Sequence, residues 1–189
     1  MAFCTEADFA VLKFMDGFNT PFLDFVLKLV SYMGNMGIVW ILLGILMLSL
    51  RKTRKQGAFC VMAFLLAVLV GNVILKNAVD RVRPYDLFDW IQVRIVKPKD
   101  GSFPSGHCMS TFAFATALVF VYKKWGIAAL VFGVFMAFSR LYFQVHFLTD
   151  VLAGVAVGIL CGIAAYFIAK RIHWFDDMKW TIKTKRKPA

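Results

Sequence analysis

His146 and Asp150 are four residues apart, and together they are the pair in this sequence best suited to nucleophilic chemistry. Residues at positions i and i+4 share one face of a helix, so the carboxylate can lie beside the imidazole. In that place it would fix the ring tautomer and stabilise the imidazolium. The other ring nitrogen would be free to attack phosphorus, so His146 is the candidate nucleophile and Asp150 its partner. A structural hydrogen-bonded pair is the alternative.

A second candidate group begins one of the apolar stretches, with the sequence Pro104-Ser105-Gly106-His107. Ser105 can cap a helix here, and its hydroxyl can donate to an anion. Gly106 lets the backbone approach a ligand closely, and the first amides of a helix are unpaired donors. These features predict an anion site, with His107 as the general acid that protonates a leaving oxygen. An ordinary capped helix is the alternative.

Three cations complete the candidate site, because Lys76 and Arg83 follow one apolar stretch and Arg140 ends another. Ionisable groups at membrane depth are costly to bury and usually functional. Arginine suits a bidentate grip on phosphate oxygens, whereas lysine supplies a point charge. A single cation at a helix end is often only a side chain that reaches toward water. Three cations near two histidines predict a phosphate-binding site.

The composition indicates a membrane protein. Of the 189 residues, 60% are hydrophobic, and the mean hydropathy is +0.71. A soluble domain of this length is closer to half apolar. The net charge of +11 could suggest nucleic acid binding, but the basic residues flank long apolar runs. We therefore interpret them as membrane orientation signals, and we expect membrane lipids but no nucleic acid as partners.

Five apolar stretches approach the roughly 20 residues that a helix needs to cross a bilayer. They cover residues 33–50, 57–75, 107–122, 125–143 and 147–169. The expected fold class is therefore all-α, a polytopic membrane helix bundle. The length suits a single domain, 1–189, with interfacial helices in 1–32, a transmembrane core in 33–170 and a basic tail in 171–189.

The segment 6–33 differs from the apolar stretches, because charged residues interrupt it. Gly17, Asn19 and Pro21 divide it in two, which predicts two amphipathic helices that lie at the membrane interface. A sixth span through 20–33 is the alternative. Acidic residues near the start and the lack of a basic, then apolar, opening argue against a signal peptide.

Loop charges predict the orientation in the membrane. Most basic residues lie at one set of helix ends, in 51–55, 123–124, 170–171 and 179–187, where Asp176 and Asp177 are the acidic residues nearby. The positive-inside rule places these ends in the cytoplasm. The loop 76–106 and the turn near 143–147 would then face outward in a cell inner or plasma membrane. The C-terminus would be cytoplasmic and the candidate site extracytoplasmic.

The cysteines predict neither a metal centre nor a redox site. The chain has four cysteines, Cys4, Cys60, Cys108 and Cys161, and none of them forms a CxxC pair. The last three lie in apolar segments. We interpret them as small core or lipid-facing residues. The sequence also has no zinc-ligand spacing. We therefore expect no metal and no other cofactor. The oligomeric state is open.

The three groups of polar residues resemble the motifs of the type 2 phosphatidic acid phosphatase family, which are K-x6-R-P, P-S-G-H and S-R-x5-H-x3-D. All three are complete and in order, and the likeness extends from about residue 57 to the C-terminus. The matching residues are Lys76, Arg83 and Pro84, then Pro104 to His107, then Ser139, Arg140, His146 and Asp150.

The resemblance implies a metal-independent phosphatase with defined roles. His146 would be the nucleophile, Asp150 its partner, and His107 the acid for the leaving group and then the base for water. The residues that would bind phosphate are Lys76, Arg83, Ser105, Gly106 and Arg140. Many members have six spans, and this chain would begin after the first. Acid phosphatases and vanadium haloperoxidases share the site.

We expect a lipid phosphate or diphosphate as substrate, since a lipid can reach an outward site at the membrane edge. Undecaprenyl diphosphate, which is released on the outward face, is the first choice. Phosphatidylglycerol phosphate and phosphatidic acid are alternatives, and the residues 85–103 do not separate them. Two other classes are a vanadium haloperoxidase-like oxidoreductase, which five apolar spans disfavour, and a non-catalytic lipid-binding or transport protein, which would not need both histidines.

Overall fold

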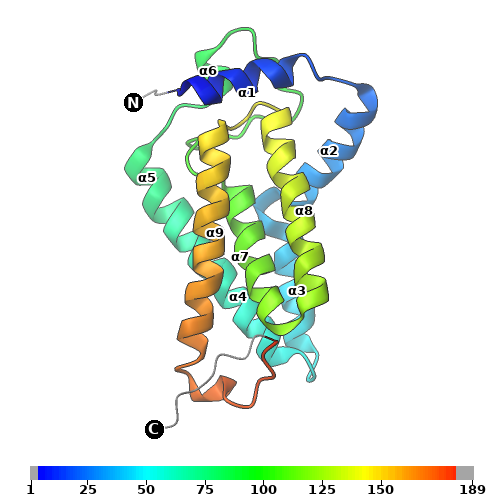
Figure 1. The fold of residues 1–189 in the computed structure, drawn as a ribbon, viewed down its shortest axis with the longest axis vertical. Coiled ribbons are helices and arrows are strands. Elements are labelled where there is room, and N and C mark those ends of the chain that lie inside the picture. Colours follow the sequence, from blue (N-terminus) through cyan, green and yellow to red (C-terminus); the bar gives the residue numbers. More distant parts are fainter. Residues whose placement is uncertain (1–3, 182–189) are drawn as a thin grey trace.

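The computed structural model describes residues 4–181, and in this part of the chain all of the regular secondary structure is helical (Figure 1). Seven of the helices in this part of the chain have eleven residues or more. The expected all-α class is therefore confirmed. The long helices are α1 (Glu6–Asp16), α2 (Pro21–Met33), α3 (Ile38–Ser49), α4 (Arg54–Val68), α7 (Gly106–Val121), α8 (Lys123–Tyr142) and α9 (Leu148–Ala169).

The central helix of the bundle is α7, which packs against α9, α8 and α4. Close contact with α9 depends on glycines at every fourth position of α9, as in many membrane helix pairs. A Cβ at Gly154 would lie 2.6 Å from the carbonyl oxygen of Ser105, and one at Gly158 would lie 2.5 Å from that of Met109. These approaches hold the N-terminal ends of the two helices together, where both candidate histidines lie.

Three segments in the described part of the chain are long and apolar enough to cross a membrane, namely Arg54–Leu87, Lys123–Tyr142 and Leu148–Ala169. A fourth is added if α2 and α3 count as one span, although they meet at a 43° bend. The protein is thus a multi-pass membrane protein. Helix α7 is apolar but has 16 residues, and α3 has 12. The count of five spans stays a prediction.

The expected first span is shortened at its start by a turn. Met36 and Gly37 have positive φ angles of 52° and 69°, so the helix cannot run through them. A Cβ at Gly37 would also lie 2.6 Å from the ring of Phe64. The sequence 34–37 therefore ends α2 and separates it from α3, which begins at Ile38.

The two helices expected between residues 6 and 33 are α1 and α2, with their break at 17–20. Thr5 caps α1 through a capping box with Asp8, and Thr20 caps α2, which has Pro21 in its first turn. Figure 1 shows α1 lying across one end of the bundle, above the turn that joins α8 to α9.

A π-helical segment, Leu69–Leu75, joins α4 to the short helix α5 (Lys76–Val79). Such segments are often found at functional sites. Residues 80–83 then lead to α6 (Pro84–Leu87), after which residues 88–105 run without a helix to the start of α7. This arrangement brings α6 and the loop after it to the end of the bundle that α1 covers (Figure 1).

The opposite end of the bundle carries the α3–α4 connection, the α7–α8 junction and the end of α9 (Figure 1). After α9, the segment up to residue 181 folds back onto this end. Its Thr181 amide donates to the carbonyl of Phe120 at 2.7 Å, and Asp177 pairs with Lys55. The remainder of the predicted basic tail, residues 182–189, lies outside the described residues.

Candidate active site

A cavity of about 580 Å³ lies among α2, α4, α5, the start of α7 and the turn between α8 and α9. Six of the eight candidate residues line it: Lys76, Arg83, Gly106, His107, Arg140 and His146. These side chains come from α5, the loop after it, the start of α7, the end of α8 and the turn before α9. Residues far apart in the sequence are therefore brought to one place, as expected.

His146 is buried in the turn between α8 and α9, with only 2% of its surface exposed. Its Nδ1 lies 2.7 Å from the carbonyl oxygen of Ser102, which can only accept, so Nδ1 carries the proton. Its Nε2 lies 3.4 Å from Nη1 of Arg83 and has a free lone pair for this donor or for an electrophile. The ring is thus held in the tautomer that a nucleophilic Nε2 needs.

Asp150 lies beside His146, but the contact differs from the expected hydrogen bond. Its Oδ2 is 3.7 Å from Nδ1 of His146, farther than the Ser102 carbonyl. The same oxygen accepts from the Ser102 hydroxyl and, at 2.9 Å, from the amide of Phe147. Asp150 therefore orients His146 partly through Ser102, a residue that sequence reasoning did not select.

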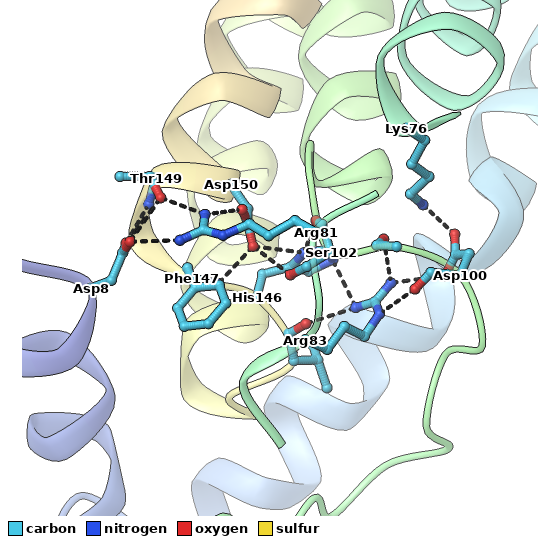
Figure 2. Close-up of polar contacts among 12 residues, drawn as sticks. Asp8, Lys76, Arg81, Arg83, Asp100, Ser102, His146, Phe147, Thr149 and Asp150 are labelled. Carbon is cyan, nitrogen blue, oxygen red and sulfur yellow. Dashed lines mark hydrogen bonds and ion pairs between the residues drawn. The ribbon is translucent and has the colours of Figure 1, made fainter. Parts of the chain in front are cut away.

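Arg81 and Asp8 form a second buried layer behind Asp150 (Figure 2). Arg81 donates to Asp150 through Nη1 and to Asp8 through Nη2, at 2.9 Å in the latter case. Both side chains have no exposed surface. Burial raises the pKa of Asp8, but hydrogen bonds from Thr149, Arg81 and Thr5 outweigh this and leave the pKa below its ordinary value.

Sequence reasoning missed both residues of this second layer. Arg81 lies only two positions before Arg83 in the same motif, so its basic character was a usable signal. Asp8 had no such signal, because an acidic residue in an amphipathic helix at a membrane interface is ordinarily solvated.

Lys76 and Arg83 share a carboxylate that sequence reasoning did not select, that of Asp100. Arg83 is further fixed by the carbonyls of Asp100 (2.8 Å) and Val145 (2.7 Å). Burial raises the pKa of Asp100, but Lys76 and Arg83 together lower it to about 2. A carboxylate thus occupies the place between two cations where a phosphate oxygen could bind.

Arg140 is 1% exposed at the end of α8. Its Nη1 donates to the hydroxyl of Ser31 on α2 at 2.6 Å, and its Nε has no hydrogen-bond partner among the described residues. A buried guanidinium nitrogen without an acceptor is costly. Arg140 also lines the cavity, so its guanidinium group adds positive charge to the wall of the cavity.

Ser105 is placed differently from the expectation. It is the N-cap residue of α7, but its hydroxyl makes no capping bond and is fully buried without a partner in the described part of the chain. Its amide donates to the carbonyl of Asp150 at 3.1 Å. Ser105 is also absent from the cavity lining, whereas its neighbours Gly106 and His107 are present.

The electrostatics of the cavity favour an anion and an uncharged nucleophile. Burial, with the guanidinium groups of Arg83 and Arg140, lowers the pKa of His146 to about 4, although Asp150 acts in the opposite direction. The imidazole is therefore neutral near pH 7. Residues 4–181 contain no group of three or more His, Cys, Asp or Glu side chains placed to hold a metal ion. The arrangement suits nucleophilic attack on a phosphoryl group.

Comparisons with known proteins identify the family of the chain. Residues 57–174 match the model of the PAP2 superfamily. An undecaprenyl-diphosphatase of Sulfolobus acidocaldarius is 34% identical over 121 residues, which are 64% of this chain and 58% of that protein. The chain therefore spans less than two thirds of this relative.

Two solved structures share the fold over most of the chain. One is a PAP2 type phosphatidylglycerolphosphate phosphatase from Bacillus subtilis, with a TM-score of 0.71, 30% identity, and 89% of this chain and 87% of that chain covered. The other is Aquifex aeolicus LpxE, with a TM-score of 0.78, 25% identity, and 88% and 99% covered. The chain belongs to the PAP2 superfamily, and it is a membrane lipid phosphatase, a hydrolase.

Proposed function

We propose that this protein removes phosphate from a lipid phosphate or diphosphate through a phosphohistidine intermediate on His146. The observation that carries the proposal is the tautomer of His146, which donates from Nδ1 to the Ser102 carbonyl and presents Nε2 to a cavity lined by cations. A neutral, fixed imidazole beside guanidinium groups can attack phosphorus without first losing a proton.

In the first step, Nε2 of His146 attacks phosphorus in line with the leaving oxygen. Negative charge on the phosphoryl oxygens is offset by Lys76, Arg83 and Arg140 and by the amides at the start of α7, and such positioned charges supply most of the catalysis in this reaction. The place of Arg140 in the cavity wall supports its role as one of these groups.

His107 lines the same cavity and supplies the proton in this proposal. It protonates the lipid alkoxide or phosphate that departs, and in the second step it takes a proton from the water that cleaves the phosphohistidine. Asp150 keeps His146 in place during both steps. Ser105 acts through its backbone, since its amide ties α7 to α9 beside the nucleophile.

The lipid part of the substrate fits the apolar portion of the cavity wall. Residues of the α2–α3 region and of α4 line it, including Met36, Ile41, Phe64 and Val68. Apolar surface beside a cationic pocket suits a molecule with a hydrocarbon chain and a phosphate group. This supports lateral access from the membrane.

We also propose the expected orientation, with five spans, the cavity outward and the C-terminus in the cytoplasm. The helix ends that carry most basic residues lie at the end of the bundle opposite the α8–α9 turn (Figure 1), and this turn supplies His146 to the cavity wall. This separation fits the positive-inside rule. In this arrangement α1 lies at the outer membrane interface. The five spans are the three long apolar segments together with the shorter helices α3 and α7.

Among lipid substrates, undecaprenyl diphosphate is our first choice. The outward cavity and the likeness to a protein named undecaprenyl-diphosphatase support it. Phosphatidylglycerol phosphate, supported by the structural likeness to the Bacillus subtilis phosphatase, and phosphatidic acid are the alternatives. Because the chain is a hydrolase, we propose neither of the two other classes considered from the sequence, the oxidoreductase and the non-catalytic lipid-binding or transport protein.

The test is phosphate release by the detergent-solubilised protein from a panel of these three lipids, with EDTA in excess. We expect the highest kcat/KM on undecaprenyl diphosphate and no loss of activity in EDTA. A preference for either phospholipid would overturn the substrate choice alone. A strict need for a divalent ion would overturn the proposed role of the cations.

A further inference from the structure

Asp8 is a fully buried carboxylate on α1, outside the residues that match the superfamily model. Its Oδ1 accepts from the amide of Thr149 at 2.9 Å, and its Oδ2 accepts from Arg81 at 2.9 Å and from the amide of Thr5 at 3.2 Å. These contacts join the N-terminal helix to the first turn of α9. That turn also holds Asp150.

One guanidinium group therefore bridges two buried carboxylates. Arg81 donates from Nη1 to Asp150 and to the Thr149 hydroxyl, and from Nη2 to Asp8. Its guanidinium carbon also lies 4.0 Å from the centre of the Phe147 ring. This planar, two-sided grip is one that arginine can make and lysine cannot.

The bridged group, which consists of Asp8, Arg81 and Asp150, is connected to His146 through Ser102. Asp150 accepts from the Ser102 hydroxyl, and the Ser102 carbonyl accepts from Nδ1 of His146 at 2.7 Å. In Figure 2, His146 is drawn between this group and the group formed by Arg83, Asp100 and Lys76. A change at Asp8 can thus affect the imidazole of His146 through the side chains of Arg81 and Asp150 and through Ser102.

The charge of the bridged group explains why a second carboxylate matters. Two carboxylates and one guanidinium carry a net charge of −1 when all are ionised. His146 becomes cationic as it forms a bond to phosphorus, and a negative group behind the ring stabilises that charge. Without Asp8, Arg81 would neutralise Asp150 alone, and the negative charge behind the ring would be lost.

We propose that Asp8 is a positioning residue for the hydrolysis, which acts through Arg81 to leave Asp150 negatively charged and aligned behind His146. This inference rests on the proposed function, because it presumes that His146 is the nucleophile. It assigns a role in turnover to a helix that the superfamily model does not cover.

The first test compares Asp8→Asn with Asp16→Asn, a matched change at an exposed position of the same helix. Asp8→Asn should lower kcat by about 10- to 100-fold, the scale of one charge lost several ångströms away at an effective protein dielectric. Its KM should stay within about twofold, because Asp8 does not line the cavity. Asp16→Asn should match the wild type. Equal kcat in both variants would overturn the inference.

A double-mutant cycle separates positioning from loss of structure. If Asp8 acts through Asp150, Asp8→Asn should lower kcat by less than about twofold in an Asp150→Asn background. Full additivity would mean that Asp8 acts independently of Asp150, and it would overturn the proposal.

Arg81→Lys keeps the charge and provides a second variant in case Asp8→Asn does not fold. Lysine cannot bridge both carboxylates, so kcat should fall at least about tenfold with KM little changed. Wild-type kcat in this variant would contradict the bridging role.

His146→Ala distinguishes a failure of this inference from a failure of the proposed function. If His146→Ala abolishes phosphate release while Asp8→Asn is silent, only the role of Asp8 is wrong. If His146→Ala retains normal release, the proposed function is wrong, and the inference falls with it.

Discussion

At the scale of single residues, the site depends on backbone contacts as much as on the expected side-chain pair. The Ser102 carbonyl lies nearer to Nδ1 of His146 than Asp150 does. A carbonyl oxygen fixes the tautomer without adding charge. Asp150 can then be shared between Ser102, Phe147 and Arg81 and still stabilise the imidazolium.

The depressed pKa of His146 leads to a prediction about pH. His146 must be neutral to attack, and the value of about 4 means that it is protonated only as the pH falls through this value. The acid limb of kcat/KM, which reports the free enzyme, should therefore lie near pH 4 after correction for ionisation of the substrate. A limb near the ordinary histidine pKa of about 6.5 would contradict the buried, cation-flanked environment.

Arg140 should contribute strongly to binding of a transition-state mimic. Vanadate adopts the five-coordinate shape of the phosphoryl group in flight, and a site complementary to that state binds it more tightly than phosphate. Arg140→Lys should raise the inhibition constant of orthovanadate about tenfold, because one charge-assisted hydrogen bond is worth about that factor. Titration of the wild type and of Arg140→Lys with orthovanadate in the phosphate-release assay measures the two inhibition constants.

Arg94→Lys is the control for that measurement, since Arg94 pairs with Asp24 and does not line the cavity. It should leave vanadate inhibition unchanged. An equal loss in both variants would show that Arg140 has no special contact with the bound anion.

The residues that could be found from the sequence are those whose types and spacing are tied to a motif. Lys76, Arg83, His107 and His146 all line one cavity, as expected. Asp8 and Asp100 were missed because their roles depend on long-range packing, which no local pattern reveals. Nothing in the sequence around either residue distinguishes it from other acidic residues. In the fold, Asp8 pairs with the buried Arg81 and Asp100 pairs with the buried Arg83.

At the scale of elements, the position of the site depends on how closely α9 approaches α7. The helix boundaries of α7, α8 and α9 agree with the predicted apolar stretches to within two residues. The first stretch was predicted to begin at residue 33, but α3 begins at Ile38. Hydropathy alone could not place this start, because Met36 is apolar and yet has the positive φ angle of a turn.

Gly154 tests this close approach. An alanine Cβ would lie 2.6 Å from the Ser105 carbonyl oxygen, which belongs to the backbone and cannot rotate away. Gly154→Ala should therefore lower the free energy of unfolding by about 1–3 kcal/mol, the usual cost of overpacking, and should also lower kcat by moving Asp150 relative to α7. Thermal unfolding in detergent and turnover assays measure the two effects.

Ala156→Val, at an exposed position on the same helix, is the matched control for Gly154→Ala. It adds volume without a clash and should change neither stability nor turnover appreciably. If Gly154→Ala behaved like this control, the glycines of α9 would not be what sets the spacing of the two helices.

At the scale of the whole molecule, the α8–α9 turn, which supplies His146 to the cavity wall, and the most basic helix ends lie at opposite ends of the bundle (Figure 1). This separation is what the positive-inside rule requires of an outward-facing site. Composition was sufficient to predict a multi-pass membrane protein. The number of spans was harder to predict, because α3 and α7 are shorter than a bilayer-crossing helix and depend on neighbouring segments.

The orientation can be tested by labelling cysteines with a reagent that does not cross the membrane. A cysteine at position 100 should be modified from outside in intact cells, and one at position 124 should react only after permeabilisation. The partly exposed Cys4 is replaced first, so that it does not add signal. The reverse pattern would place the cavity in the cytoplasm and remove the main argument for undecaprenyl diphosphate.

The central claim is that phosphate passes through a covalent bond to Nε2 of His146. The most direct measurement is an alkaline quench during turnover, since phosphohistidine survives base, followed by mass spectrometry of the peptide that contains residue 146. We expect a phosphoryl group on His146 in the wild type, and none in His146→Ala, with turnover in that variant reduced by at least about a hundredfold. His107→Ala should show a similar loss of turnover. Normal phosphate release by His146→Ala, or a phosphoryl group on a different residue during turnover, would contradict the account.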